Sequence, residues 1–316
     1  MLTVQSISFS YANSITLNAI DFTLKRGKIL AVIGESGCGK STLLKIIYGL
    51  HDLDEGQILW NDKKIYGPKN YLVPGMEFIK YLAQDFDLMP YITVAENVGK
   101  FLSNVDIEKK INRIKELLDV VDLSEYFNER TANLSGGQMQ RVALAKALAV
   151  EPDILLLDEP FSHIDNFKKN ELRYKLFAFI KQNNITTIIA THDCTDILSF
   201  ADEVMVLQQG AMIDHGSTKR IYNYPKNKYV ASLFGEVNEI KNTVFDDKTA
   251  VSKLLLYPHQ IEVVTFSKLQ VEVVQSFFRG SHFLIECLYN TEKLYVQHFI
   301  NLKIGSKIFI AKKLQN

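Results

Sequence analysis

The sequence contains few cysteines. Three occur among 316 residues, Cys38, Cys194 and Cys287, and they are widely separated. An odd number of distant cysteines argues against a disulfide framework and a cysteine-based metal site, and it is typical of a reducing compartment. The chain also lacks a secretory signal pattern and any apolar run near the roughly 18–20 residues that cross a bilayer. We therefore expect a soluble, intracellular protein.

An excess of charge of either sign is absent as well. The chain carries 36 Lys and Arg residues against 36 Asp and Glu residues, so its formal net charge is zero. Without a global field, neither nucleic acid nor an anionic lipid surface is favoured as a partner. The hydrophobic content of 47% is ordinary for a globular protein, and the length allows two domains.

One glycine-rich stretch, residues 34–42, is the strongest pattern that is present. It follows an apolar run at 29–33 and precedes a helical pattern at 43–50, which is the strand–loop–helix context of a phosphate-binding loop. Backbone N–H groups of such a loop surround phosphate oxygens, while Lys40 would reach the outer phosphates and the Ser41 hydroxyl would ligate Mg²⁺. The alternative is a glycine-rich turn with a chance lysine. The expected contacts with a nucleoside triphosphate are Gly34, Glu35, Ser36, Gly37, Cys38, Gly39, Lys40, Ser41 and Thr42.

The segments around this loop alternate between strand and helix patterns. Residues 2–30 predict an antiparallel region whose turn carries Tyr11, either a packed loop aromatic or a platform for a nucleobase. Gln84 ends a short apolar strand, Thr93 is a plausible N-cap, and helical periodicity runs from 107 to 121. A second glycine-containing helix start follows, and it either binds an anion or is a glycine-tolerant cap. It consists of Ser135, Gly136, Gly137 and Gln138.

Two later apolar strands end in residues that suit phosphate chemistry. The run at 154–157 is typical of a central parallel strand and ends in Asp158 and Glu159. At that position Asp158 suits Mg²⁺ through water and Glu159 suits an attacking water, the alternative being a solvated acidic turn. His192 follows the strand at 185–190 and is either a γ-phosphate contact or a structural histidine. The alternation predicts a layered α/β domain with a mainly parallel sheet.

The ordered set resembles the nucleotide-binding subunits of ATP-binding cassette (ABC) transporters, over residues 2 to about 235. In chain order, the matching motifs are the adenine-stacking aromatic (Tyr11), Walker A (34–42), the Q-loop glutamine (Gln84), the ABC signature (134–138), Walker B with its catalytic glutamate (154–159) and the switch histidine (His192). Residues 162–165 resemble the D-loop, although His163 and Ile164 stand where Ala-Leu is usual. The segment at 52–56 lacks the usual proline, for which we expect no functional cost.

The resemblance implies a P-loop NTPase fold, with an ATPase domain at 1–235 and a helical subdomain at about 86–150. It implies a dimer closed head to tail, in which the signature of one subunit contacts the γ-phosphate held by Lys40 of the other. The implied cofactors are ATP and Mg²⁺. Beyond the 34–42 loop, the implied ATP contacts are Tyr11, Ser135, Gly136, Gly137, Gln138 and Asp165. The implied catalytic residues are Glu159, His192, Lys40 and Gln84, and the implied Mg²⁺ ligands are Ser41, Gln84 and Asp158.

The C-terminal segment resembles one group within this family. Residues 217–238 and 257–261 are similar to passages in binding-protein-dependent importers of sugars, polyamines, iron, sulfate or molybdate, which carry a C-terminal TOBE (OB-like) domain. Tyr257 replaces an arginine of the second passage. Strand patterns within 236–316 predict a small all-β OB-like domain. It could bind an anion, a regulator or its twin, or simply stabilise a dimer.

These features together predict the ATP-hydrolysing subunit of an ABC importer, peripheral on the inner face of the plasma membrane. Its expected partners are a second copy or a related ATPase subunit, integral membrane permease subunits and, indirectly, an extracytoplasmic solute-binding protein. Two alternatives stay open: an ABC exporter ATPase, and a soluble cassette ATPase whose OB-like domain binds nucleic acid. The balanced charge of residues 236–316 leads us to expect no nucleic-acid partner.

Overall fold

The computed structural model describes residues 1–12, 14–71, 73–83, 85–242 and 253–313. These residues form two compact units, Met1–Lys219 and Arg220–Asn316, here called the first and second unit. Gln84, a predicted site residue, lies outside the described residues. Among the helices in the described ranges, none is long and apolar enough to cross a membrane.

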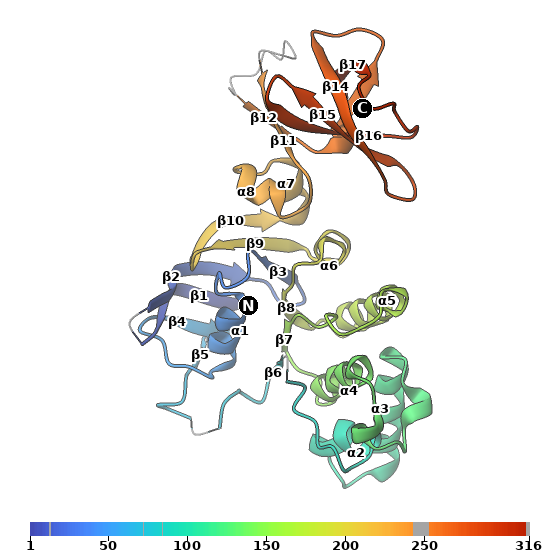
Figure 1. The fold of residues 1–316 in the computed structure, drawn as a ribbon. Helices are drawn as coiled ribbons and strands as arrows, with labels where there is room; N and C mark the ends of the chain where they lie inside the picture. The colour runs from blue at the N-terminus through green and yellow to red at the C-terminus, as the bar shows by residue number, and fades with distance from the viewer. Residues whose placement is uncertain (13, 72, 84, 243–252, 314–316) are drawn as a thin grey trace. The chain divides into compact units, whose positions relative to one another are not determined.

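A six-stranded sheet forms the centre of the first unit, with strand order β10-β9-β3-β8-β7-β6 (Figure 1). Its strands are β3 (Ile29–Ile33), β6 (Ile79–Leu82), β7 (Ile154–Asp158), β8 (Thr186–Ala190), β9 (Glu203–Gln208) and β10 (Ala211–Ser217). All neighbouring pairs are parallel except β10 with β9. Every residue of β3, β7 and β8 is buried, as expected for central parallel strands covered on both faces. The predicted α/β fold with a mainly parallel sheet is confirmed.

An antiparallel sheet of four strands completes the core of the first unit. Its order is β2-β1-β4-β5, with β1 at Leu2–Tyr11, β2 at Ser14–Leu24, β4 at Glu55–Trp60 and β5 at Lys63–Ile65. The buried residues of β1 are Leu2, Val4, Ile7 and Phe9, so the predicted period-two alternation shifts by one residue at the irregularity between Val4 and Ile7. They join one buried apolar cluster with helix α1 (Lys40–Tyr48) and with the central strands. The phosphate-loop region is therefore anchored on both sides by core packing.

The remaining helices of the first unit are α2 (Val94–Val98), α3 (Ile107–Val120), α4 (Gly136–Leu148), α5 (Asn166–Gln182) and α6 (Cys194–Phe200). Short 3₁₀ turns lie at Gly99–Phe101, Ser124–Tyr126 and Thr131–Asn133. Thr93 caps α2 through a capping box with Glu96, as predicted. Helices α2 and α3 pack against α4, and the three lie together in Figure 1. The helical periodicity predicted for 107–121 places Ile111, Ile114, Leu117 and Leu118 on one face of α3, of which Ile111 is exposed and the other three are buried.

The second unit is mostly antiparallel β structure. A five-stranded sheet runs in the order β13-β17-β14-β15-β16, beside a two-stranded pair. Its strands are β11 (Asn238–Lys241), β12 (Lys253–Leu256), β13 (Ile261–Val264), β14 (Leu269–Phe278), β15 (Phe283–Tyr289), β16 (Glu292–His298) and β17 (Lys307–Lys312). A 3₁₀ turn at Pro258–Gln260 precedes β13, α8 spans Lys228–Ser232, and α7 spans Thr218–Asn223 across the junction of the units. The predicted C-terminal β structure is confirmed, and its assignment as an OB-like domain stays a prediction.

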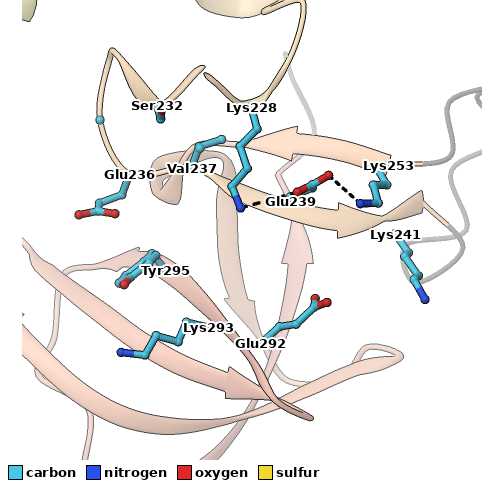
Figure 2. A pocket seen from close by; sticks show the side chains of 11 residues that line it. Lys228, Ser232, Glu236, Val237, Glu239, Lys241, Lys253, Glu292, Lys293 and Tyr295 are labelled. Carbon is cyan, nitrogen blue, oxygen red and sulfur yellow. Dashed lines mark hydrogen bonds and ion pairs between the residues drawn. The ribbon is translucent and has the colours of Figure 1, made fainter. Parts of the chain in front are cut away.

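A cavity of about 750 Å³ lies within the second unit (Figure 2). Its lining mixes lysine and glutamate side chains from α8, β11, β12 and β16. The Glu239 carboxylate lies 2.8 Å from Lys253 Nζ and 3.6 Å from Lys228 Nζ. Because opposite charges pair across the cavity, its lining favours no ligand of one sign.

Candidate functional site

The loop between β3 and α1 requires glycine. Gly34, Gly37 and Gly39 have φ of 150°, 81° and 107°, conformations that residues with a side chain rarely adopt. A Cβ atom on Gly34 would lie 2.2 Å from the Leu207 carbonyl oxygen, and one on Gly39 would lie 2.7 Å from the Leu17 side chain. The backbone can therefore turn tightly here only without side chains, which explains the glycine spacing of residues 34–42.

Positive charge gathers at this loop. Lys40 Nζ donates to the carbonyl oxygens of Gly34 at 2.8 Å and Glu35 at 3.0 Å. Lys40 also begins α1, whose N-cap Gly39 provides no side-chain cap. The first N–H groups of α1 and the lysine ammonium thus occur together, which is the arrangement that binds a phosphate.

A buried carboxylate contacts the first turn of α1. Asp158, only 3% exposed, ends β7 and accepts a hydrogen bond on Oδ1 from Ser41 Oγ at 2.9 Å. Its Oδ2 accepts a second hydrogen bond, from the Tyr81 hydroxyl at 3.2 Å. Burial, and secondarily the charge of Asp158, raises the pKa of Tyr81, so the phenol stays protonated and donates. Tyr81 is not predicted from the sequence, because no local signal pairs a tyrosine on β6 with a carboxylate on β7.

A second acidic group lies beside a histidine. Glu159 has φ of 49°, and its Oε1 lies 2.9 Å from Nδ1 of His192. The Glu159 backbone N–H donates to the Ala190 carbonyl oxygen at 2.9 Å, which joins the end of β7 to the end of β8. The His192 side chain is 77% exposed and that of Glu159 is 18% exposed. A carboxylate and an imidazole are therefore presented together at the carboxyl edge of the sheet, where open α/β folds bind ligands.

Comparison with known proteins agrees with this geometry. The model of the ABC transporter family matches residues 17–162. The spermidine/putrescine import ATP-binding protein PotA of Bacillus anthracis is 31% identical over 299 residues, covering 94% of this chain and 87% of that protein. The sulfate/thiosulfate import ATP-binding protein CysA of Mesostigma viride is 38% identical over 270 residues, covering 84% and 75%. The chain belongs to the ABC transporter family.

Solved structures of ABC proteins share the fold. CbiO1 from Clostridium perfringens, part of the ABC transporter complex cbiONQ, is 30% identical with a TM-score of 0.62, covering 71% of this chain and 90% of that one. A dimeric post-hydrolysis state of the ATP-binding cassette MJ0796, bound to ADP and Pi, is 26% identical with a TM-score of 0.61, covering 69% and 99%. With import ATP-binding proteins among its relatives, this ABC protein is the ATPase subunit of an importer.

The ABC signature caps helix α4. Ser135 Oγ accepts from the Gln138 backbone N–H at 3.3 Å, and Gln138 Oε1 accepts from the Ser135 N–H at 2.8 Å. This capping box leaves Gly136 open, since a Cβ there would meet nothing within 4 Å. A Cβ on Gly137 would instead lie 2.7 Å from the His163 carbonyl oxygen, so the D-loop packs directly on the signature.

Gln140 joins the signature helix to Walker B and the D-loop. Its Nε2 donates to the Glu159 carbonyl oxygen at 3.0 Å, and its Oε1 accepts from the His163 N–H at 3.1 Å. The side chain is 2% exposed, so these bonds are shielded from water. Gln140 is not predicted from the sequence, because in the helix pattern it is one more position of α4.

The two unusual D-loop residues have different roles in the fold. Ile164 is buried, and His163 is exposed with its ring edge against Phe86, 5.4 Å between centroids. Ser162 Oγ lies 3.0 Å from His163 Nδ1. Asp165 is the N-cap residue of α5. The departure from Ala-Leu therefore adds a contact between the D-loop and the residue two positions after Gln84.

A buried ion-pair network holds the strand end that carries His192. Arg173 Nε lies 2.5 Å from Asp196 Oδ1, and Arg173 Nη2 pairs with Asp193. Thr191 Oγ1 donates to Asp196 Oδ2 at 3.0 Å and accepts from the Asp193 N–H at 3.1 Å. Both neighbours of His192 are thus tied to α5 and α6. Burial, opposed by Arg173, raises the pKa of Asp196 to about 6.

Tyr11 lies at the end of β1 and is 43% exposed. Its hydroxyl lies 3.1 Å from Nε2 of His51, and its ring makes edge contacts with Phe9 and His51 at centroid distances of 4.8 and 5.4 Å. The aromatic is therefore held in place while part of it stays accessible, as a platform for a base requires. His51 has no motif of its own, and only the fold brings it to Tyr11.

Proposed function

We propose that two copies of this chain, or one copy and a related ATPase subunit, close head to tail around two ATP molecules and open after hydrolysis. The structure of dimeric MJ0796 with ADP and Pi supports the dimer, because the match covers 99% of that chain. In this arrangement Ser135, Gly136 and Gly137 of one subunit face the γ-phosphate at Lys40 of the other. Gating of this kind couples nucleotide turnover to motion.

The main support for the hydrolytic role is the contact between Glu159 Oε1 and His192 Nδ1, which lie 2.9 Å apart. This pair lies at the same edge of the sheet as Asp158 and its partner Ser41. Glu159 orients or deprotonates the attacking water, and His192 contacts the γ-phosphate. Lys40 and the first turn of α1 stabilise charge on the transferring phosphoryl group.

The residues at Asp158 fit a magnesium ion. Within the described residues no group of three or more His, Cys, Asp or Glu side chains could hold a metal by itself. Mg²⁺ keeps several waters and takes one or two protein oxygens plus substrate phosphates, which matches Ser41 Oγ and the buried Asp158 carboxylate. Bound there, Mg²⁺ would neutralise charge on the phosphates. Gln84 is the third proposed ligand.

The proposed domain bounds follow from the resemblance to ABC importer subunits. We assign residues 1–235 to the ATPase domain, 86–150 to its helical subdomain and 236–316 to a TOBE-like domain. The helical subdomain, with α2, α3 and α4 packed together, would receive a permease subunit. The chain would then act at the inner face of the plasma membrane, and a solute-binding protein would deliver solute to the permease from the opposite, extracytoplasmic side.

The cargo is chosen outside this chain. One relative is named for import of the cation pair spermidine and putrescine and another for the anions sulfate and thiosulfate, although both resemble this chain over most of its length. Permease and binding-protein partners of opposite selectivity can therefore use the same ATPase architecture.

Glu159→Gln tests the proposal directly. The variant should bind ATP normally, lose nearly all turnover and accumulate as an ATP-bound dimer, which size-exclusion chromatography detects. Affinity capture of this trapped form from membranes of the source cell should recover a permease and a solute-binding protein. Unchanged hydrolysis would remove Glu159 from the mechanism, and a capture that contains only soluble proteins or nucleic acid would overturn the transport role.

A further inference from the structure

Asp158 is held by hydroxyl groups on both sides. Ser41 Oγ donates to Oδ1 at 2.9 Å and the Tyr81 hydroxyl donates to Oδ2 at 3.2 Å. Ser41 comes from the first turn of α1, whereas Tyr81 comes from β6, whose neighbour in the sheet is β7. In the register of these strands Tyr81 lies opposite Leu156, two residues before Asp158. The phenol thus spans from the neighbouring strand to the carboxylate.

We propose that Tyr81 is a positioning residue for the Mg²⁺ site of this ATPase, an inference that rests on the proposed role of Asp158. A carboxylate that orients metal-bound water must keep its plane at one angle of rotation about the Cβ–Cγ bond. Ser41 restrains that rotation through a single hydrogen bond, to Oδ1. Tyr81 fixes the other oxygen, so the pair sets the plane before the metal arrives.

The aromatic ring of Tyr81 has a packing contact of its own, separate from the hydrogen bond that its hydroxyl donates. Its ring packs against Tyr48 with centroids 5.5 Å apart, and this packing does not need the oxygen. Phenylalanine at position 81 would therefore keep the ring contact and remove only the donor. Because Asp158 is 3% exposed, water does not readily replace the lost hydrogen bond.

Tyr48 supplies a matched control. It belongs to the same ring contact, and its hydroxyl makes no hydrogen bond to Asp158 in the described part of the chain. Tyr48→Phe and Tyr81→Phe thus delete the same atom from neighbouring rings. Only the second deletion reaches the carboxylate.

The experiment measures binding of a fluorescent ATP analogue to the full chain, first in EDTA and then during a Mg²⁺ titration. Tyr81→Phe should bind the analogue in EDTA as tightly as the parent chain does. The Mg²⁺ concentration that gives half of the maximal change in analogue binding should be about 10-fold higher than in the parent chain. Tyr48→Phe should match the parent chain in both conditions. Catalytic turnover is recorded separately at saturating Mg²⁺, where the Tyr81→Phe defect should be smaller than at low Mg²⁺.

Two results overturn the inference. One is a Mg²⁺ requirement in Tyr81→Phe that equals that of the parent chain. The other is a loss of analogue binding that is as large in EDTA as in Mg²⁺, which would mean that Tyr81 supports the nucleotide loop itself. Asp158→Asn separates this inference from the proposed function. If Asp158→Asn raises the Mg²⁺ requirement and Tyr81→Phe does not, only the role of Tyr81 fails. If neither raises it, the metal role of Asp158 fails with it.

Discussion

Replacing Arg173 by methionine tests how the His192 segment is held. The Arg173 side chain is 5% exposed and that of Asp196 is 1% exposed, so neither charge reaches solvent. Removing one partner leaves the other as an uncompensated buried charge, which costs about 3–5 kcal/mol. Since a protein is stabilised by only about 5–15 kcal/mol, Arg173→Met should lower the unfolding free energy of the first unit by a large fraction.

The assay uses the single tryptophan of the chain. Trp60 is 2% exposed and lies in the first unit, so its fluorescence during urea titration reports the unfolding of that unit. The double variant Arg173→Met/Asp196→Asn should lose less stability than Arg173→Met, because the carboxylate that then lacks its arginine, that of Asp193, is 34% exposed and no longer accompanied by a buried one. A single-variant loss below about 1 kcal/mol would refute the reasoning, as it would place the pair among weak solvated ion pairs.

The same variant has a predicted pH dependence. The pKa of Asp196 is raised from 3.8 to about 6, so the folded state favours the protonated form and the unfolding free energy falls as pH rises between these values. Without Arg173 the pKa should rise further, because the attraction that opposes burial is gone. The loss in Arg173→Met should therefore be larger at pH 8 than at pH 5. Equal losses at both pH values would contradict this account.

Three further substitutions test the loop and the signature. Lys40→Ala should abolish detectable ATP binding in equilibrium titrations, because Nζ is the positive group held at the phosphate loop, and normal affinity would refute that assignment. Gly137→Ala should destabilise the first unit by about 1–3 kcal/mol, since its Cβ would lie 2.7 Å from the His163 carbonyl oxygen. Gly136→Ala has open space at this atom and should keep its stability in the same urea assay, so equal losses would disprove the contact.

Several features of the site were predictable because they are local. The glycines of residues 34–42 are required by backbone angles within one turn, and the capping boxes at Thr93 and Ser135 involve residues three apart. The short apolar run at 154–157 is typical of a buried strand, here β7, and its end places Asp158 and Glu159 at the sheet edge. Such signals are read from neighbouring residues alone.

Other features required the fold. Tyr81 and Asp158 are 77 positions apart, Gln140 and His163 are 23 apart, and Tyr11 and His51 are 40 apart. Each contact depends on strand order or on how a helix packs, which no stretch of sequence specifies by itself. Tyr81 on β6 meets Asp158 only because β6 is the parallel neighbour of β7.

The amino-acid sequence by itself determined the α/β class and the glycine-rich loop, because hydrophobic periodicity and backbone geometry within a few residues decide them, and its resemblance to ABC proteins predicted which residues carry the ATPase motifs. Only the tertiary structure decided how those residues are supported: by Tyr81 at the carboxylate of Asp158, by Gln140 between signature and D-loop, and by Arg173 beneath the His192 segment. The physical reason is that buried polar side chains must find partners in three dimensions, and the packing of distant elements selects those partners.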